Sequence, residues 1–136
     1  MTAYPKPLPR ITPDNRPFWE AARRHELHLP RCLDCQRPWW PPGPVCPDCL
    51  SARHEWTRVS GRGVVSSWVV FHKLYFPAFA DDIPYAVVQV ELEEGPRLIS
   101  NLVGVKNEEI RLGMPVEIVF DDVTPEISIP RFRPRA

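Results

Sequence analysis

Four cysteines supply the chemistry that stands out in this sequence. They are Cys32, Cys35, Cys46 and Cys49, in a C-x2-C-x10-C-x2-C pattern. Two C-x-x-C pairs joined by a short loop are typical of a tetrathiolate metal site, because each pair forms a tight turn whose sulfurs converge on one metal. Turn-forming residues stand inside the second pair, at Pro47 and Asp48. The spacing therefore predicts one metal site built from all four thiolates.

A closed site of four thiolates favours zinc in a structural role. Zinc takes tetrahedral sulfur ligands, and four protein ligands leave no open coordination position for catalysis. Iron in the same site would make the chain a rubredoxin-like electron carrier, and the cysteine pattern alone does not separate the two metals. Two redox-active pairs are the other alternative, but thioredoxin-like motifs lie on a βαβ unit, which the sequence around residues 30–50 lacks. We therefore expect one structural zinc ion.

The segment before the cysteines predicts an arm and a short helix. Residues 1–12 carry prolines at alternate positions, which favour an extended chain. A helix is expected from Asp14, as the N-cap, to about His25, with Pro17 in its first turn. We assign residues 1–25 to this arm and helix.

Two short strands frame the cysteines. Leu27 to Arg31 alternates apolar and polar side chains before the first pair, and His54 to Val59 forms the return strand after the second pair. A hairpin of this kind brings one cysteine pair back to the other. Residues 26–60 are therefore predicted to be a rubredoxin-like zinc ribbon.

The composition changes at Gly61-Arg62-Gly63. Of the 21 Val and Ile residues, 18 lie after this junction, and β-branched residues favour strands. The expected strands are Val64–His72, Pro84–Leu92, Arg97–Val105, Val116–Asp121 and a short one around Ile127 and Ile129, with a helix or turn at 107–112 and a tail at 131–134. This order is typical of a five-stranded OB-fold barrel over residues 61–136. The predicted fold class is mainly β, with an N-terminal helix, a zinc ribbon and an OB-fold.

The ordered set of motifs resembles a family of acyl-CoA-associated proteins that join a zinc ribbon to an OB-fold. The matching pieces are the Phe18-Trp19 helix, Leu29 to Cys32 leading into Cys35, Trp40-Pro41-Pro42, Cys46-Pro47-Asp48-Cys49, Gly61-Arg62-Gly63, Pro84-Tyr85, Leu92 to Gly95, Gly113-Met114-Pro115-Val116 and Pro130-Arg131-Phe132-Arg133-Pro134. Many members of that family have glycine soon after the second cysteine, where this chain has Gln36-Arg37. The set covers nearly the whole chain.

The resemblance implies a non-catalytic accessory subunit. Members of the family assemble with larger thiolase-like or lipid-transfer-type aldolase subunits, or with hydratases of the MaoC type, in hetero-oligomers. They help to bind the coenzyme A thioester, while the partner carries the nucleophile or base. We favour the thiolase-type partner because it is the more frequent one in the family.

The sequence contains no set of residues typical of a catalytic site. The four histidines are scattered and form no H-E-x-x-H pattern, and the serines form no G-x-S-x-G elbow. The metal site uses every cysteine, which leaves no free thiol nucleophile. This result agrees with an accessory role.

Aromatic and basic residues after the first barrel strand are candidates for ligand binding. OB-folds often bind ligands near this loop, where aromatic rings stack on bases and cations neutralise phosphates. The candidates for contact with coenzyme A or the acyl chain are Phe71, His72, Lys73, Phe76 and Phe79. The alternative is that Phe71 and Phe76 belong to the core and the rest is ordinary loop.

Aromatic residues in the N-terminal half are candidates for the partner interface. They are Phe18, Trp19, Trp39 and Trp40, the last two followed by rigid prolines. Adjacent side chains in an extended segment point in opposite directions, so we expect one of the two adjacent tryptophans to pack on the ribbon and the other to face a partner. The alternative is that the ribbon packs both against Trp56 and the helix.

Composition and charge exclude several classes of protein. No apolar run approaches the roughly 18 residues of a membrane span, and the first residues lack an apolar signal core, so we expect a cytoplasmic protein. The net charge of zero divides into +4 for residues 1–62 and −4 for residues 63–136. Some zinc-ribbon and OB-fold proteins bind single-stranded nucleic acid, but a barrel of net charge −4 disfavours that function here.

Overall fold

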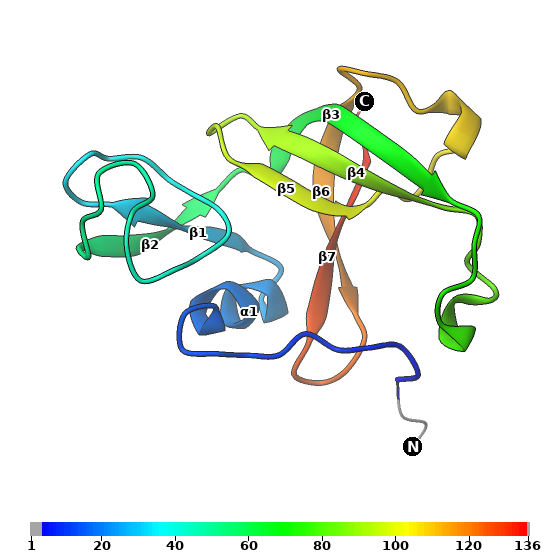
Figure 1. Cartoon of the computed structure of the whole chain (residues 1–136), viewed down its shortest axis with the longest axis horizontal. Helices are drawn as coiled ribbons and strands as arrows, with labels where there is room; N and C mark the ends of the chain where they lie inside the picture. Colours follow the sequence, from blue (N-terminus) through cyan, green and yellow to red (C-terminus); the bar gives the residue numbers. More distant parts are fainter. Residues whose placement is uncertain (1–3, 136) are drawn as a thin grey trace.

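The structure, a computed structural model, describes residues 4–135. An extended arm leads into one helix, α1 (Arg16–Arg23), followed by a ribbon of two strands, β1 (Leu27–Cys32) and β2 (His54–Val59). The barrel follows, with β3 (Arg62–Phe71), β4 (Tyr85–Leu92), β5 (Arg97–Asn101), β6 (Pro115–Asp122) and β7 (Ser128–Pro134). The ribbon and the barrel lie at opposite ends of the molecule, and α1 lies beside both (Figure 1). The mainly β architecture predicted from the sequence is confirmed.

Helix α1 begins and ends differently from the prediction. Its N-cap residue is Asn15, not Asp14, because the Asn15 carbonyl accepts the first helical hydrogen bonds, from the Phe18 and Trp19 N–H groups at 3.0 and 3.3 Å. The Asn15 side chain accepts a hydrogen bond from the Thr12 N–H at 2.7 Å in the turn before the helix. The helix ends at Arg23, and His25 adopts a left-handed backbone with φ of 61°. A left-handed residue does not continue a helix, and it turns the chain into β1.

The five barrel strands are antiparallel neighbours in the order β5-β4-β3-β6-β7. The two edge strands meet at one place, where the Val103 N–H donates to the Phe132 carbonyl at 2.8 Å and Leu102 pairs with Phe132. The barrel is therefore nearly closed. The expected C-terminal tail is wrong, because residues 131–134 belong to β7 and Phe132 is fully buried.

One hydrophobic core runs through all three parts of the chain. It includes Phe18 of α1, Leu29 of β1 and the inward-facing residues Val65, Val88 and Val90 of the barrel. The alternating burial of β4 follows from its alternating sequence, since successive side chains of a strand point to opposite faces. Among the described residues, no helix is long and apolar enough to span a membrane.

Gly63 allows β3 and β4 to approach each other at the start of the barrel. A Cβ atom at this position would overlap the Glu91 carbonyl oxygen and lie 2.8 Å from Val90 Cγ1. Both neighbours belong to β4, whose backbone is held by its pairing with β3 and β5. The position therefore requires glycine for reasons of space.

We predict that Gly63→Ala lowers the free energy of unfolding by about 1–3 kcal/mol, the usual cost of overpacking a rigid site. Gly43→Ala is the matched control, because no atom lies within 4 Å of the Cβ position there, and its effect should stay within about 0.5 kcal/mol. Urea unfolding of both variants measures the difference. Equal effects would show that the close approach of β3 and β4 is not a constraint.

Candidate functional site

The four cysteine sulfurs converge at the end of the ribbon away from the barrel. All four lie within 4.8 Å of one another, with 3.5 Å between the sulfurs of Cys32 and Cys49 and 3.6 Å between those of Cys35 and Cys46. Tetrahedral zinc with bonds of about 2.3 Å holds its sulfur ligands about 3.8 Å apart. The ligand set and its spacing therefore fit a structural zinc ion.

The two cysteine pairs form knuckles of the same shape. In the first, the Gln36 N–H donates to the Cys32 carbonyl at 3.0 Å, and in the second the Leu50 N–H donates to the Cys46 carbonyl at 2.9 Å. Gln36 and Leu50 occupy equivalent places and both have a left-handed backbone, with φ of 67° and 64°. Gln36 thus adopts the conformation that glycine adopts readily, and its side-chain amide donates to the Leu33 carbonyl at 2.9 Å.

Backbone amides point at two of the four cysteine sulfurs. The Cys35 N–H lies 3.4 Å from Cys32 Sγ, and the Asp48 N–H lies 3.4 Å from Cys46 Sγ. The hydrogen bond from Cys35 is the main cause that lowers the pKa of Cys32 to about 7. A metal takes the thiolate and not the thiol, so the amide beside Cys32 favours a bound cation at this ligand.

The structure corrects Phe18 as a predicted interface residue, and it shows Trp39 as the one of the two adjacent tryptophans that packs on the ribbon. Trp39 is 5% exposed and packs against Cys32 and Cys46, and Phe18 is 3% exposed in the main core. Neither side chain is accessible to a partner on this chain. Trp40 packs on Phe18 with ring centroids 4.4 Å apart, so each of the adjacent tryptophans has a packing role.

Trp19 and Trp40 are half-buried and line a small apolar cavity between α1 and the barrel. The cavity has a volume of about 190 Å³, and β5 and β7 supply its other wall, including Ile99 and Ile129. Ile99 is 68% exposed at the open edge of the barrel. Two of the four interface candidates therefore remain at a surface with apolar character.

The five candidates for ligand binding separate into two groups. Phe71 and Phe79 both pack on Tyr85: the Phe71 ring is stacked on it with centroids 5.4 Å apart, and the Phe79 ring is tilted with centroids 5.8 Å apart. The other three, His72, Lys73 and Phe76, are exposed on the loop. The Lys73 ammonium lies over the Tyr75 ring, 5.2 Å from its centroid, and not over the Phe79 ring.

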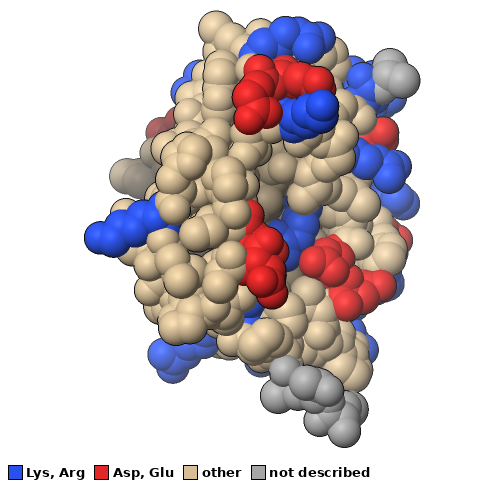
Figure 2. Space-filling view, turned by 90° about the vertical axis from the view of Figure 1, so that its right-hand side faces the viewer, with Lys and Arg blue, Asp and Glu red and all other residues tan. Residues whose placement is uncertain are grey.

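Phe79 lines a cavity of about 510 Å³ that the N-terminal arm covers on one side. The arm contributes Lys6, whose Nζ lies 2.6 Å from Asp82 and 5.3 Å from the centroid of the Phe79 ring. Figure 2 shows a hollow on this side of the barrel with acidic and basic side chains around it. Sequence reasoning missed Lys6 because nothing in the sequence signals that the arm crosses the barrel.

Arg131 supplies a second cation to this cavity. Its side chain is held by Asp121, at 3.1 Å, and by the Asn101 side-chain oxygen, at 2.7 Å. The cavity thus combines aromatic walls from Phe79 and Tyr85 with two ion pairs, one made by Lys6 and one by Arg131. These walls suit a planar ring, and a negatively charged group would compete with the two carboxylates for the cations.

We predict that Cys46→Ser abolishes stoichiometric metal binding and unfolds the ribbon, because a structural zinc site contributes folding free energy directly. Val45→Ser is the matched control, since Val45 is the exposed neighbour of Cys46. Elemental analysis gives the metal content, and circular dichroism gives the thermal stability. A Cys46→Ser protein with full zinc content and unchanged stability would contradict the site, and a coloured protein that contains iron would contradict zinc.

Comparisons with known proteins match both halves of the chain. Residues 19–55 match the ChsH2 rubredoxin-like zinc ribbon domain, and residues 56–121 match the ChsH2 C-terminal OB-fold domain. A chain of the solved Ltp2–ChsH2(DUF35) aldolase is similar, with 42% identity and a TM-score of 0.85 over 93% of this chain and 98% of that one. A DUF35 protein from Sulfolobus solfataricus, 15% identical with a TM-score of 0.63, shares the fold.

Three relatives differ in how much of their length this chain spans. The probable enoyl-CoA hydratase alpha subunit of Thermomonospora curvata is 42% identical over 95% of this chain, which spans 40% of that protein. The 3-oxo-4,17-pregnadiene-20-carboxyl-CoA hydratase alpha subunit of Mycobacterium tuberculosis is 32% identical over 93% of this chain, which spans 39% of that protein. The DUF35 domain-containing scaffold protein of Methanothermobacter thermautotrophicus is 33% identical over 85% of this chain, which covers 87% of that protein. The chain belongs to the DUF35 family, whose ChsH2-type members join a rubredoxin-like zinc ribbon to an OB-fold.

Proposed function

We propose that the protein is a non-catalytic accessory subunit of an acyl-CoA-processing complex, bound to a larger thiolase-like or lipid-transfer-type aldolase subunit. The observation that carries this proposal is the similarity to a chain of the Ltp2–ChsH2(DUF35) aldolase, which this chain covers almost completely. The name scaffold protein, given to the archaeal relative, supports a role in assembly. In this role the larger subunit supplies the nucleophile or base.

The surface proposed for the larger subunit surrounds the apolar cavity beside α1. Exposed apolar groups flanked by half-buried tryptophans are typical of the centre of a protein interface, where aromatic residues are enriched. Ile99 supplies the exposed apolar group, and Trp19 and Trp40 supply the aromatic walls. The metal-held ribbon fixes Trp40, so the zinc site acts on binding through the position of this side chain.

The cavity under the N-terminal arm is the proposed binding site for part of the coenzyme A thioester. A coenzyme A thioester carries an adenine ring and several phosphates, which match the aromatic walls and anchored cations of this cavity. The residues proposed for contact are Phe79 and Lys6, with Arg131 as a second cation. Asp82 neutralises Lys6 in the chain alone, so a phosphate would compete with Asp82 for the ammonium.

A second candidate partner is a hydratase subunit. Two relatives are named as alpha subunits of hydratases that act on coenzyme A thioesters, although this chain spans only about 40% of their length. The same docking surface and ligand cavity are proposed for this partner. The two candidates differ in the larger enzyme and not in the role proposed for the chain.

We predict that Ile99→Asp weakens the complex with the Ltp2 subunit at least tenfold, because a carboxylate would be buried in an apolar interface. Leu112→Asp is the matched control, since Leu112 is 71% exposed and lies in the loop before β6, and it should change the Kd less than twofold. Titration calorimetry measures both values. Equal Kd values for the two variants would exclude the surface beside α1, and the same titration with a MaoC-type hydratase tests the second partner.

We also predict that Lys6→Ala combined with Phe79→Ala raises the KM of the assembled complex for its acyl-CoA thioester roughly threefold or more. The expected size follows from the roughly 0.5–2 kcal/mol that a cation on an aromatic face contributes. Lys73→Ala combined with Phe76→Ala is the comparison, because these residues lie outside the cavity lining. Steady-state kinetics give the KM of both double variants. A larger increase in KM for the Lys73 and Phe76 variant would contradict the cavity and favour a ligand contact on the outer loop.

A further inference from the structure

Helix α1 presents arginines that lack carboxylate partners. Seven arginines elsewhere in the chain lie within 4.0 Å of an acidic side chain: Arg37, Arg53, Arg58, Arg62, Arg131, Arg133 and Arg135. No carboxylate of residues 4–135 lies that close to Arg23 or Arg24, which are exposed at the end of α1. Five other arginines share this property, namely Arg10, Arg16, Arg31, Arg97 and Arg111, but Arg23 and Arg24 also line one polar cavity together. These two guanidinium groups are therefore charges that the described chain leaves uncompensated by ion pairs.

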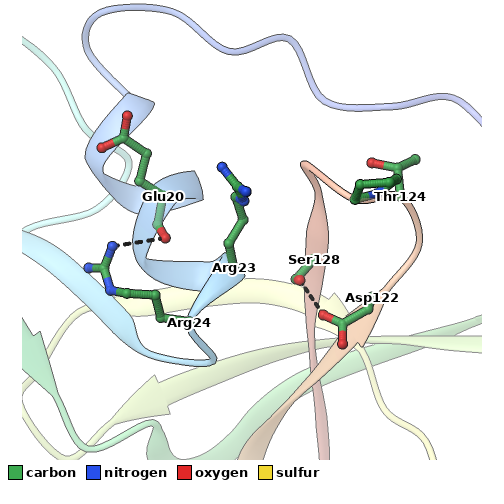
Figure 3. Close-up of a pocket in the computed structure, with 7 residues that line it drawn as sticks. Glu20, Arg23, Arg24, Asp122, Thr124 and Ser128 are labelled. Atoms are coloured by element: carbon green, nitrogen blue, oxygen red, sulfur yellow. Dashed lines mark hydrogen bonds between the residues drawn. The ribbon is translucent and has the colours of Figure 1, made fainter.

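Both arginines line a polar cavity of about 580 Å³ between α1 and the turn that joins β6 to β7. Arg23 extends into the space between the helix and the Thr124 turn, as Figure 3 shows. Arg24 folds back, and its Nη1 donates to the Glu20 carbonyl at 3.2 Å. One guanidinium group is thus free to reach a ligand, and the second adds positive charge beside it.

The two acidic side chains of this cavity do not neutralise Arg23. Asp122 accepts hydrogen bonds from His25, at 2.8 Å, and from Ser128, and these bonds hold its pKa below the usual value. The Glu20 carboxylate points away from Arg23 on the far side of the helix (Figure 3). The Asp122 carboxylate therefore links β6 to β7, through Ser128, and to the segment after α1, through His25.

The opposite wall of the cavity is a fixed turn. Thr124 Oγ1 accepts hydrogen bonds from the backbone N–H groups of Glu126, at 3.3 Å, and Ile127, at 3.0 Å. The Val123 and Thr124 N–H groups donate to the Ile127 carbonyl at 3.1 and 3.2 Å. These hydrogen bonds within residues 123–127 define the shape of this wall, and the Arg23 side chain faces it across the cavity.

We propose that this cavity receives an acidic segment of the larger subunit, with Arg23 pairing with an Asp or Glu carboxylate of that segment. The proposal rests on the proposed function, because it needs the larger subunit. The Arg23 guanidinium group favours a carboxylate as the occupant, since the two match in charge and geometry. Glu20 and Asp122 also line the cavity, but neither lies within 4.0 Å of Arg23. The position favours a protein partner: the apolar cavity of Trp19 and Trp40 flanks the same helix, and interfaces combine tryptophan with arginine.

The test is the affinity of the chain for the Ltp2 subunit after charge reversal at the cavity. We expect Arg23→Glu combined with Arg24→Glu to raise the Kd at least tenfold at roughly 50 mM salt, chiefly through slower association. Most of this difference should disappear at roughly 500 mM salt, because screening weakens attraction between exposed charges. Arg23→Gln combined with Arg24→Gln should give a smaller increase in the same direction.

The matched control reverses two exposed basic residues on the barrel. Lys106→Glu combined with Arg111→Glu changes the net charge by the same amount, next to the short helical turn Asn107–Glu109, which lies far from α1 (Figure 1). This control should alter the Kd less than twofold. Equal effects of the two double variants would overturn the proposal, because they would show a response to net charge alone.

Two further results separate the possible failures. If the chain binds the larger subunit and charge reversal at the cavity leaves the Kd unchanged, this proposal is overturned and the proposed function stands. If the chain forms a complex with neither larger subunit, the proposed function itself is overturned. Inorganic phosphate is the second probe. If phosphate shifts the Arg23 signals in the NMR spectrum of the chain alone and charge reversal leaves the Kd unchanged, the cavity binds small anions and the proposal is overturned.

Discussion

The bonds between one metal ion and four thiolates are the constraint on which the rest of this structure depends. The ribbon loops have little apolar core of their own, since the buried cluster there consists of Cys32, Cys46 and Trp39, with Cys35 against it. Structural zinc in small domains contributes about 10–16 kcal/mol of apparent binding free energy, far more than the roughly 2–3 kcal/mol of one buried aromatic side chain. The metal therefore replaces the core that these loops lack, and it fixes the segment that carries the two adjacent tryptophans.

Aromatic packing connects the metal site to the barrel. Trp40 follows the buried Trp39 and packs on Phe18, and Phe18 belongs to the core shared by the ribbon and the barrel. Helix α1 contacts both modules, and its residues line both the apolar cavity and the arginine cavity. A binding surface built in this way consists of rigid elements, which lowers the entropic cost of association. This rigidity supports the proposed accessory role, in which the chain presents a preformed surface to a larger enzyme.

The sequence predicted the parts of the molecule that follow from local patterns. The cysteine spacing gave the ribbon, and the enrichment in Val and Ile after Gly61 gave the barrel, because metal knuckles and strands leave local signals. Contacts between distant segments left no such signal. The burial of Trp39 depends on the cysteines around it, the place of Phe132 depends on the closure of β5 against β7, and Lys6 reaches Phe79 only because the arm crosses the barrel. Each of these positions depends on tertiary packing, which the periodicity of the sequence does not indicate.

The central claim is that the metal-held ribbon and α1 together present the surface that binds the larger subunit. Hydrogen–deuterium exchange of the zinc-loaded chain, alone and with that subunit, tests this claim most directly. The account predicts slower exchange in the complex for α1, for the segment after Trp39 and for β5, while the exposed face of β3 around Trp68 keeps its rate. Protection of β3 around Trp68 with unchanged exchange in α1 and β5 would contradict the account.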